Sequence, residues 1–457
     1  MEESELLRRI HNIENDLHLD NQTLLGIPLW RIMRYKTRLD YINRRVGYVA
    51  NTGISKMVGE RHIKVISGFW RYIFKKGLNI FFPFNRLVSI NDSYIDKFID
   101  PVIEESELRN DSYLIVDPAG YVGNYQRGHK KKTISNESRT LSMLLIGMLF
   151  KCLTPMLYKK QVDRLFTTVQ PAFELDIRFK ANFFDYLAVF LTRYYYYLFW
   201  FKIIKPKRVF VVYREGYFPQ IAVCKKLGIP VAEFQHGITL DATVSFAGEY
   251  DQRIDPDYFL VFGDYWKGPQ FGMPLDRIIN IGWAYSKYLQ KTIAENSEKH
   301  DIEVLVISSP EISDAILDTL QELSKNEGDY SFDIRLHPCE SYNEAQQEKL
   351  KAIPKAQVVD NKTDSALVLP TYKYVVGENS SVIYEALSVG CKVGMLNMCG
   401  LRPAIDLPGI KDNFFIINNR EDFERFLMED SDQSISKAEF YSEFDSKRFM
   451  EFIENKM

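Results

Sequence analysis

Short apolar runs alternate with amphipathic stretches along the second half of the chain. Each run is rich in β-branched or aromatic residues and ends at a polar residue or a glycine, which is typical of strands buried on both faces. A helical pattern over 219–227, closed by Gly228, separates the first two runs. Strand, helix and strand joined by short connections predict a parallel sheet covered on both sides. The predicted strands of this first set are Arg208–Tyr213, Val231–Phe234, Tyr258–Phe262 and Ile278–Ile281.

The alternation restarts after a polar, charged stretch at 292–301. None of the new strands is followed by a GxGxxG turn, which disfavours a dinucleotide-dependent dehydrogenase. We therefore expect an α/β protein in which two doubly wound, Rossmann-like domains face one cleft and divide near 283–301. The predicted strands of the second set are 304–308, 333–336, 357–359, 374–377 and 392–396, and the predicted helices are 311–325, 344–352, 364–369 and 381–388.

The N-terminal part of the chain has a different pattern. Its first 100 residues predict helices, the first expected strand lies at Ser112–Val116, and further helices are predicted over about 136–204. The C-terminal residues predict helices that pack back across the first domain. The resulting division is an accessory region at 1–100, domains at 101–290 and 301–430, and a returning helix at 431–457.

Charge is uneven along the chain. The whole protein of 457 residues has a net charge of only −3, which gives no signal for nucleic acid. Between Arg31 and Arg86, however, thirteen Lys or Arg residues stand against Asp40 and Glu60, a net charge of +11. Aromatic residues interleave with the basic ones over 66–86, which suits a helix lying on an anionic membrane surface. The alternative is a helix packed on its own domain with a solvated basic face.

Cysteine usage and hydropathy indicate the compartment. The five cysteines are scattered without a CxxC pair, so neither a disulfide framework nor a zinc site is expected. Two apolar stretches, 141–157 and 182–204, are interrupted by Lys151, Asp185 and Arg193. Because a charge at mid-bilayer costs roughly 2.5–3.5 kcal/mol, buried helices are expected there rather than spans. The acidic N-terminus is unlike a signal peptide. We expect a cytoplasmic protein, peripheral on the inner membrane face if the basic block binds lipid.

Polar clusters fall at the ends of four predicted strands, two in each domain. In open α/β sheets, ligands bind beyond the carboxyl ends of the strands. Equivalent clusters in two domains therefore predict a cleft with functional groups on both walls. The clusters are Arg214-Glu215-Gly216, Gln235-His236-Gly237, His337-Pro338-Cys339-Glu340 and Glu378-Asn379-Ser380-Ser381.

The second-domain clusters suit a phosphate. Ser380 or Ser381 stands where a strand meets a helix, and a helix N-terminus offers unpaired N–H groups and a partial positive charge. Glu385 follows on the same helix, near its exposed top. His337 is held extended before Pro338, and its protonated ring could stabilise a departing nucleotide. The alternatives are an ordinary serine cap, a solvated glutamate and a loop histidine.

The first-domain clusters suit an acceptor. Glu215 stands at the end of a predicted strand, directly before Gly216, where a carboxylate is well placed to act as a general base. The alternative is that Glu215 forms a salt bridge to Arg214. His236 lies between Gln235 and Gly237, and the glycine permits close approach of a ligand. His236 could contact the donor or the acceptor, or it could have a purely structural role.

These motifs resemble a known superfamily over about 205–400. Leu227–Pro230, Gln235–Gly237, Pro256–Tyr258 and Phe262-Gly263 resemble bacterial capsule and lipopolysaccharide glycosyltransferases of the GT-B fold. His337-Pro338 with the serine pair is similar to motifs of bacterial sialyltransferases and polysialyltransferases, although Arg214 stands where those enzymes have a second acid. Glu385-Ala386-Leu387 with Gly390 resembles the helix that holds the donor nucleoside. Kdo transferases and teichoic acid glycerophosphotransferases share related features.

The resemblance implies an inverting, metal-independent and cofactor-free glycosyltransferase. It would move a sugar from a nucleotide-sugar, with a CMP-linked acidic sugar favoured, to a surface glycan or glycolipid. A CDP-glycerol-type polyol phosphotransferase and a non-catalytic, membrane-associated scaffold of polysaccharide assembly are the alternatives. In the leading hypothesis the catalytic residues are Glu215, His236 and His337. Donor and phosphate would be held by His337, Pro338, Glu340, Ser380, Ser381 and Glu385, and the acceptor side would be formed by Arg214, Gly216, Gln235 and Gly237.

Overall fold

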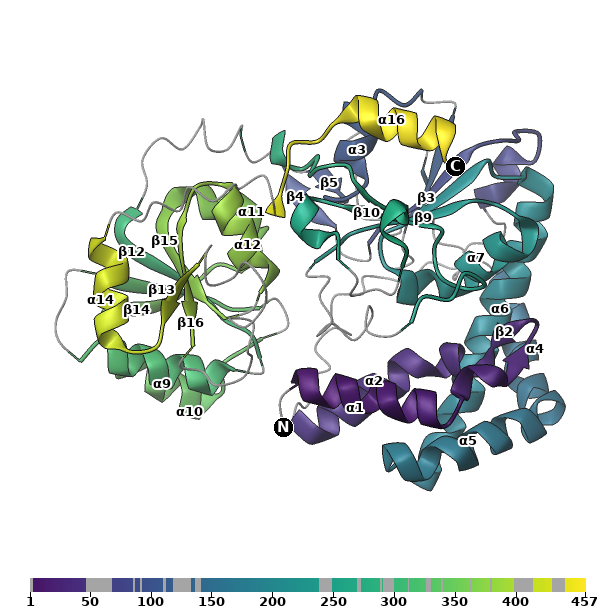
Figure 1. The fold of residues 1–457 in the computed structure, drawn as a ribbon, viewed down its shortest axis with the longest axis horizontal. Coiled ribbons are helices and arrows are strands. Elements are labelled where there is room, and N and C mark those ends of the chain that lie inside the picture. The colour runs from purple at the N-terminus through teal and green to yellow at the C-terminus, as the bar shows by residue number, and fades with distance from the viewer. Residues whose placement is uncertain are drawn as a thin grey trace.

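The structure is a computed structural model with two α/β domains side by side and a helical arm below the first (Figure 1). The C-terminal helix returns to the first domain (Figure 1). The residues that the structure describes are 3–46, 68–84, 87–90, 93–109, 112–117, 133–135, 141–237, 249–268, 273–287, 290, 300–310, 312–325, 330–337, 340–361, 363–378, 380–397, 414–429 and 440–457.

The first domain is built on a seven-stranded sheet of parallel strands. Its spatial order is β11-β10-β9-β8-β3-β6-β7, so the order reverses between β3 and β8. Helix α7 (Arg214–Leu227) connects β8 to β9. The strands are β3 (Asn79–Phe82), β6 (Tyr113–Asp117), β7 (Thr133–Ser135), β8 (Arg208–Val211), β9 (Val231–Phe234), β10 (Tyr258–Val261) and β11 (Ile278–Asn280).

Strand β3 corrects two predictions at once. It lies inside the sheet, between β8 and β6, and Ile80, Phe81 and Phe82 are fully buried. The region 1–100 is therefore not wholly helical, and the aromatic block at 66–86 is not one surface helix. Periodicity misled because so short an apolar run fits a buried strand or part of a helix equally well. Only η3 (Gly68–Tyr72) and the turn after it carry exposed aromatics, and residues 66, 67, 85 and 86 lie outside the described residues.

The second domain has a separate six-stranded parallel sheet, which confirms the predicted restart near residue 301. Its order, β14-β13-β12-β15-β16-β17, reverses between β12 and β15. The strands are β12 (His300–Ile307), β13 (Ser331–Arg335), β14 (Ala356–Val359), β15 (Tyr372–Gly377), β16 (Lys392–Leu396) and β17 (Phe415–Ile417). The helices are α9 (Ser313–Leu323), α10 (Glu344–Lys351), α11 (Ser365–Val368), α12 (Ser381–Ser388) and α14 (Arg420–Met428).

The helical arm packs on the first domain through α6, whose aromatic side chains are mostly buried. Helix α4 differs from the expected buried helix, because only Met143 and Thr154 of its residues are buried. Its outer face exposes Met148 and Met156 by 66% and 76%. The arm comprises α1 (Glu3–Asp16), η1 (Leu19–Asn21), β1 (Thr23–Leu24), β2 (Ile27–Pro28), α2 (Leu29–Val46), α4 (Leu141–Leu157), α5 (Lys159–Phe173), η6 (Ile177–Phe179) and α6 (Lys180–Ile204).

Hydropathy along the described helices gives no single helix long and apolar enough to span a membrane. Helices α4 and α5 meet that test only as a pair, and the chain bends by 73° between them.

The C-terminal segment docks at the end of β11. The Trp283 amide donates to the Ser442 carbonyl over 2.9 Å, and the Asp445 amide donates to Ile281 over 3.1 Å. Gly282 has a φ of +78°, and a Cβ there would lie 2.2 Å from the Glu443 carbonyl oxygen, so the close approach requires glycine.

The remaining elements are β4 (Val88–Ile90), β5 (Ser93–Ile95), α3 (Asp100–Glu105), η7 (Asp264–Trp266), η9 (Leu275–Arg277), η10 (Leu369–Thr371) and α16 (Ser446–Asn455).

Candidate functional site

The reversal of strand order in each sheet marks the place where a ligand is expected. At such a point the connections leave to opposite faces, and a crevice opens beyond the carboxyl ends of the two strands. In the first domain, Phe84 follows β3 and Tyr213 follows β8. In the second domain, Ser308 follows β12 and Glu378 follows β15. The predicted clusters therefore lie at or beside the two reversal points.

An aromatic group surrounds His236 on the first-domain side. The His236 ring lies 5.2 Å from the Phe84 ring and 5.1 Å from the Tyr213 ring. Tyr35, from α2 of the arm, lies 6.1 Å from Tyr213. Gly216 permits this packing, since a Cβ there would lie 3.0 Å from Tyr213 Cδ1. Burial, together with the charge of Arg214, lowers the pKa of His236 to about 4. The imidazole is therefore neutral near pH 7 and acts there as a hydrogen-bonding group, not a cation.

Glu215 lies in the first turn of α7 and not in a loop, because α7 begins directly at Arg214. The expected alternative, a salt bridge between the two, is not formed. Arg214 instead pairs with Glu233 at 2.6 Å and with Asp255 at 3.5 Å. Glu215 has no hydrogen bond in the described part of the chain. Burial raises the pKa of Glu215, and Arg34 is the cation that most opposes the rise. A carboxylate with a raised pKa and no committed partner suits general base chemistry.

The arm supplies groups that the sequence analysis did not select. Arg34 and Tyr35 lie on α2, more than a hundred residues from the α7 residues they approach. A signal was present, because Arg31, Arg34 and Arg38 recur at helical spacing on a face shared with buried apolar residues. Arginines on a buried helix face need partners inside the protein. A count of basic residues does not reveal this need, because it does not record which face they occupy.

Two predicted acceptor-side residues hold the framework instead. Gln235 is fully buried, its Oε1 accepts from the Phe262 amide, and its Nε2 donates to the Gly237 carbonyl, each over 2.9 Å. This side chain ties β9 to the end of β10 and shapes the turn of His236 and Gly237. Arg214 is likewise engaged with carboxylates. We therefore assign Gln235 and Arg214 positioning roles and not contact with an acceptor.

On the second-domain side, Ser380 caps α12. Its hydroxyl accepts from the Val382 amide over 3.4 Å, and Ser381 is the first helical residue. Gly377 ends β15 where a Cβ would lie 2.9 Å from Ile383 Cδ1, so the strand and helix pack closely. The N–H groups of the first helical turn thus point to the reversal point, as anion binding at a helix start requires.

Glu340 supports His337 and is not free for a phosphate. Its Oε2 accepts from the His337 amide over 2.9 Å. Its Oε1 accepts from the hydroxyls of Ser308, at 2.7 Å, and Ser313, at 2.6 Å. A buried carboxylate would also repel a phosphate, so the predicted donor-binding role of Glu340 becomes one of shaping the turn. Pro338 lies outside the described residues.

Glu385 is buried and not near an exposed helix top, which corrects the prediction for its position. Its Oε1 lies 3.3 Å from Lys97 Nζ, and the same amine lies 3.5 Å from Asp364. Lys97 precedes α3 of the first domain, so this ion-pair cluster crosses between the domains. Burial raises the pKa of Glu385, and Lys97 opposes the rise. Glu385 Oε2 has no hydrogen-bond partner among the described residues.

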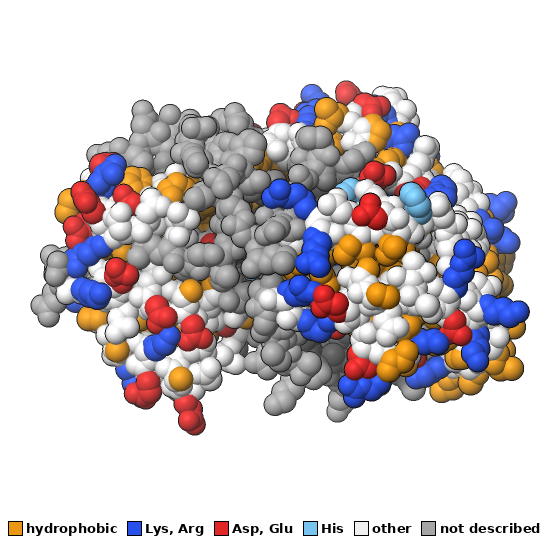
Figure 2. Space-filling model, turned by 60° about the horizontal axis from the view of Figure 1, so that its bottom comes forward, with side chains coloured by type: hydrophobic (Ala, Val, Ile, Leu, Met, Phe, Trp, Pro, Cys, Tyr) orange, Lys and Arg blue, Asp and Glu red, His pale blue; other side chains and the backbone are white. Residues whose placement is uncertain are grey.

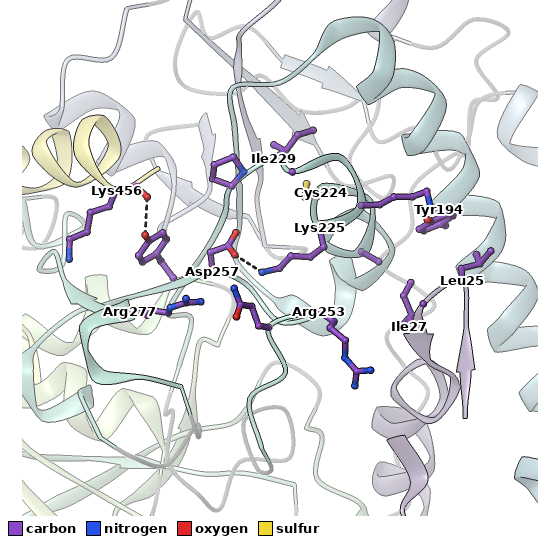
Figure 3. Close-up of a pocket in the computed structure, with 17 residues that line it drawn as sticks. Leu25, Ile27, Tyr194, Cys224, Lys225, Ile229, Arg253, Asp257, Arg277 and Lys456 are labelled. Atoms are coloured by element: carbon purple, nitrogen blue, oxygen red, sulfur yellow. Dashed lines mark hydrogen bonds and ion pairs between the residues drawn. The ribbon is translucent and has the colours of Figure 1, made fainter. Parts of the chain in front are cut away.

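A cavity of about 590 Å³ lies on the opposite side of the first domain from the candidate site, at the amino ends of β9, β10 and β11 (Figure 3). Lys225 pairs there with Asp257 at 2.5 Å, and Arg277 and Tyr194 also line it (Figure 3). None of the residues predicted for the site lines this cavity. Within the described residues no group of three or more His, Cys, Asp or Glu side chains is placed to hold a metal ion.

Comparison with known proteins gives a likeness of fold. No protein-family model matches the sequence, and no curated protein matches it. The UDP-GlcNAc 2-epimerase of Neisseria meningitidis, solved with UDP-GlcNAc, is 12% identical with a TM-score of 0.50, covering 83% of this chain and 100% of its own. The UDP-GlcNAc 2-epimerase of Methanocaldococcus jannaschii is 12% identical with a TM-score of 0.49, and the match covers 83% of this chain and 99% of the epimerase. The wall teichoic acid polymerase TagF is 12% identical with a TM-score of 0.43, and the match covers 93% of this chain and 97% of the polymerase. The chain therefore has the two-domain GT-B fold.

Proposed function

We propose that this protein is a metal-independent glycosyltransferase that moves a sugar from a nucleotide-sugar to an acceptor hydroxyl. The observation that carries the proposal is the start of α12 at the reversal point of the second sheet. There a Ser380-capped helix N-terminus stands one turn before the buried, half-engaged carboxylate of Glu385. The helix N-terminus offers N–H donors for a phosphate, and the Glu385 carboxylate offers an acceptor for a sugar hydroxyl.

On the donor side, the first-turn amides of α12 and the Ser381 hydroxyl would bind the phosphates. His337, held by Glu340, would donate to a phosphate oxygen from the end of β13, which is separated from β15 by β12. Glu385 Oε2 would accept from a ribose or sugar hydroxyl. A bound hydroxyl would relieve the cost of an unsatisfied buried oxygen, which is typically about 1–3 kcal/mol.

On the acceptor side, Glu215 would take the proton of the attacking hydroxyl. The acceptor oxygen then forms a bond to the anomeric carbon while the bond from that carbon to the phosphate oxygen breaks. The nucleotide leaves with the electron pair, and the α12 N-terminus and His337 stabilise its charge. Attack from the face opposite the leaving group inverts the anomeric centre. His236, neutral and packed between the Phe84 and Tyr213 rings, would hydrogen-bond the acceptor.

The donor we favour is a CMP-linked acidic sugar, on the similarity of His337 and the serine pair to sialyltransferase motifs. UDP- and GDP-sugars come next, and the epimerase of the same fold was solved with UDP-GlcNAc. We propose a capsule or lipopolysaccharide glycan as the acceptor and the cytoplasmic face of the membrane as the place of reaction.

A second candidate is a CDP-glycerol-type polyol phosphotransferase. The neutral state of His236 favours it, because a neutral imidazole can itself accept the proton of an attacking hydroxyl. In that reaction His236 and His337 would act on the transferred phosphoryl group. The transferred group would then carry phosphorus, whereas a glycosyltransferase transfers the sugar alone and releases all of the donor's phosphate with the nucleotide.

The deciding experiment is a thermal-shift screen with CMP, UDP, GDP and CDP, followed by a transfer assay with sugars on the nucleotide that binds. A ligand at one hundred times its dissociation constant adds about 2.7 kcal/mol of stability. Phosphorus analysis of the product separates the two candidates. Absence of stabilisation by all four nucleotides, with no turnover of any activated donor, would reject both and leave a non-catalytic scaffold.

A further inference from the structure

Arg34 is a buried cation without a partner among the residues that the structure describes. It lies on α2 with 8% of its surface exposed. Within the described part of the chain, its guanidinium makes neither a hydrogen bond nor an ion pair. The neighbouring arginines on the same helix face are engaged. Arg31 pairs with Asp20 at 3.0 Å, and Arg38 binds both carboxylate oxygens of Glu14.

This arrangement is costly in the ligand-free protein. A buried charge is normally paired or bound to a ligand, because its desolvation is otherwise uncompensated. Burial, with the charges of Arg31 and Arg38 close by, lowers the pKa of Arg34 to about 9. Glu14 is already bound by Arg38, and Glu215 has no hydrogen bond to Arg34. The described surroundings of Arg34 thus supply opposite charge at a distance but no direct acceptor.

The position of Arg34 connects it to the site. The next residue on α2, Tyr35, contacts the Tyr213 ring that flanks His236. Among the cations, Arg34 acts most strongly on Glu215. An anion held by Arg34 would therefore lie on the part of the arm whose charge acts on Glu215 and whose Tyr35 packs beside the His236 site.

We propose that Arg34 binds an anionic group of the acceptor, a phosphate or a carboxylate, and so selects an acidic acceptor. The planar guanidinium matches two oxygens of either group, which a lysine cannot reproduce. This inference rests on the proposed function only in naming the anion as part of the acceptor. The anion site itself depends on Arg34 and not on the donor.

The test measures binding of two anions, inorganic phosphate and glucuronate, by calorimetric titration against chloride at matched ionic strength. We compare the natural protein with Arg34→Gln, Arg34→Lys and the control Lys36→Gln, which removes an exposed charge from the same helix. Arg34→Gln should weaken binding by at least about tenfold, Arg34→Lys by less, and Lys36→Gln should not change it. The anion that binds with the lower Kd shows whether Arg34 recognises a phosphate or a carboxylate.

A second measurement needs no variant. Phosphate or glucuronate should protect Arg34 of the natural protein from phenylglyoxal, read by peptide mass spectrometry, while Arg178, whose side chain is 89% exposed, stays reactive. No binding of either anion, or equal affinity in Arg34→Gln, would overturn the anion site. Titration of the variants with CMP, UDP, GDP and CDP tests the proposed function separately, because Arg34→Gln should leave nucleotide affinity unchanged.

Discussion

Lys97 Nζ lies 3.3 Å from Glu385 Oε1 and joins the first domain to the helix at the reversal point of the second. The same amine reaches Asp364 at 3.5 Å, so one cation serves two carboxylates in a largely buried place. A nucleotide-sugar bound at α12 would meet a Glu385 whose orientation the other domain has set. The relative position of the domains and the readiness of the donor side are therefore linked through this amine.

Removal of that amine should destabilise the protein. Lys97→Met removes the amine that pairs with both buried carboxylates, Glu385 and Asp364, and breaking such a cluster typically costs about 3–5 kcal/mol. Urea unfolding measures the change. The control is Lys351→Met, which removes an exposed partner of Glu348 and should change stability by less than about 0.5 kcal/mol. Equal, small effects for both variants would show that the Lys97 cluster contributes nothing to domain contact.

Removal of the proposed base should abolish transfer but spare donor binding. Glu215→Gln keeps the size of the side chain and removes its proton affinity, so we expect a loss of about 10²–10⁴ in kcat. Calorimetric titration with the cognate nucleotide should give an unchanged Kd, because Glu215 belongs to the other domain. If turnover stays near normal, the base is not Glu215, and His236 becomes the candidate.

The pH profile should report Glu215 and its dependence on Arg34. The base acts deprotonated, so kcat/KM falls as the pH falls through its pKa. Burial raises that pKa, which puts the acid limb above the ordinary range of glutamate. Arg34 lowers the same pKa, so Arg34→Gln should move the limb to higher pH. A limb that stays in place, or moves to lower pH, would disprove the assignment.

The donor side should respond to small changes at α12 and His337. Loss of a charge-assisted hydrogen bond costs roughly 1.5–3 kcal/mol, so His337→Ala and Ser381→Ala should each weaken nucleotide binding about tenfold or more. Ser388→Ala is the matched control, since Ser388 ends the same helix and its hydroxyl donates to the Glu385 carbonyl. A fall of the same size in Ser381→Ala and Ser388→Ala would indicate damage to the helix and not loss of a phosphate contact.

Membrane binding should reside in exposed aromatics of 68–76 and the outer face of α4. Trp70 and Phe74 are 58% and 92% exposed, beside Arg71, Lys75 and Lys76. Hydrophobic and basic side chains lie together at the right-hand edge in Figure 2, the side on which Figure 1 places α4 to α6. Each basic residue adds about 1 kcal/mol near an anionic surface, and salt screens it.

Co-sedimentation with anionic and neutral vesicles at low and high salt checks this. We expect binding to anionic vesicles that salt weakens and that Phe74→Ser reduces. Leu275→Ser, at another exposed apolar residue, should have no effect. Equal binding to both vesicle types, or none, would leave these residues as ordinary surface.

The sequence by itself determined the strands and helices from 205 to 396, and it placed the polar clusters at their ends. It could do so because a buried parallel strand is a short apolar run, and because α12 begins with its own cap at Ser380. It did not reveal β3 as a strand, since Asn79–Phe82 is too short for its period to distinguish strand from helix.

The tertiary structure alone decided which groups meet. Glu385 pairs with Lys97 across 288 positions of sequence, and the charge of Arg34, on a helix of the arm, acts on Glu215 without direct contact. Gln235 and Glu340, equally plausible as ligand contacts from sequence, are engaged in holding turns. Local periodicity records which face of an element is buried, but it carries no information about the distant side chain that covers it. Partners, burial and pKa shifts therefore arise only when the domains and the arm have packed.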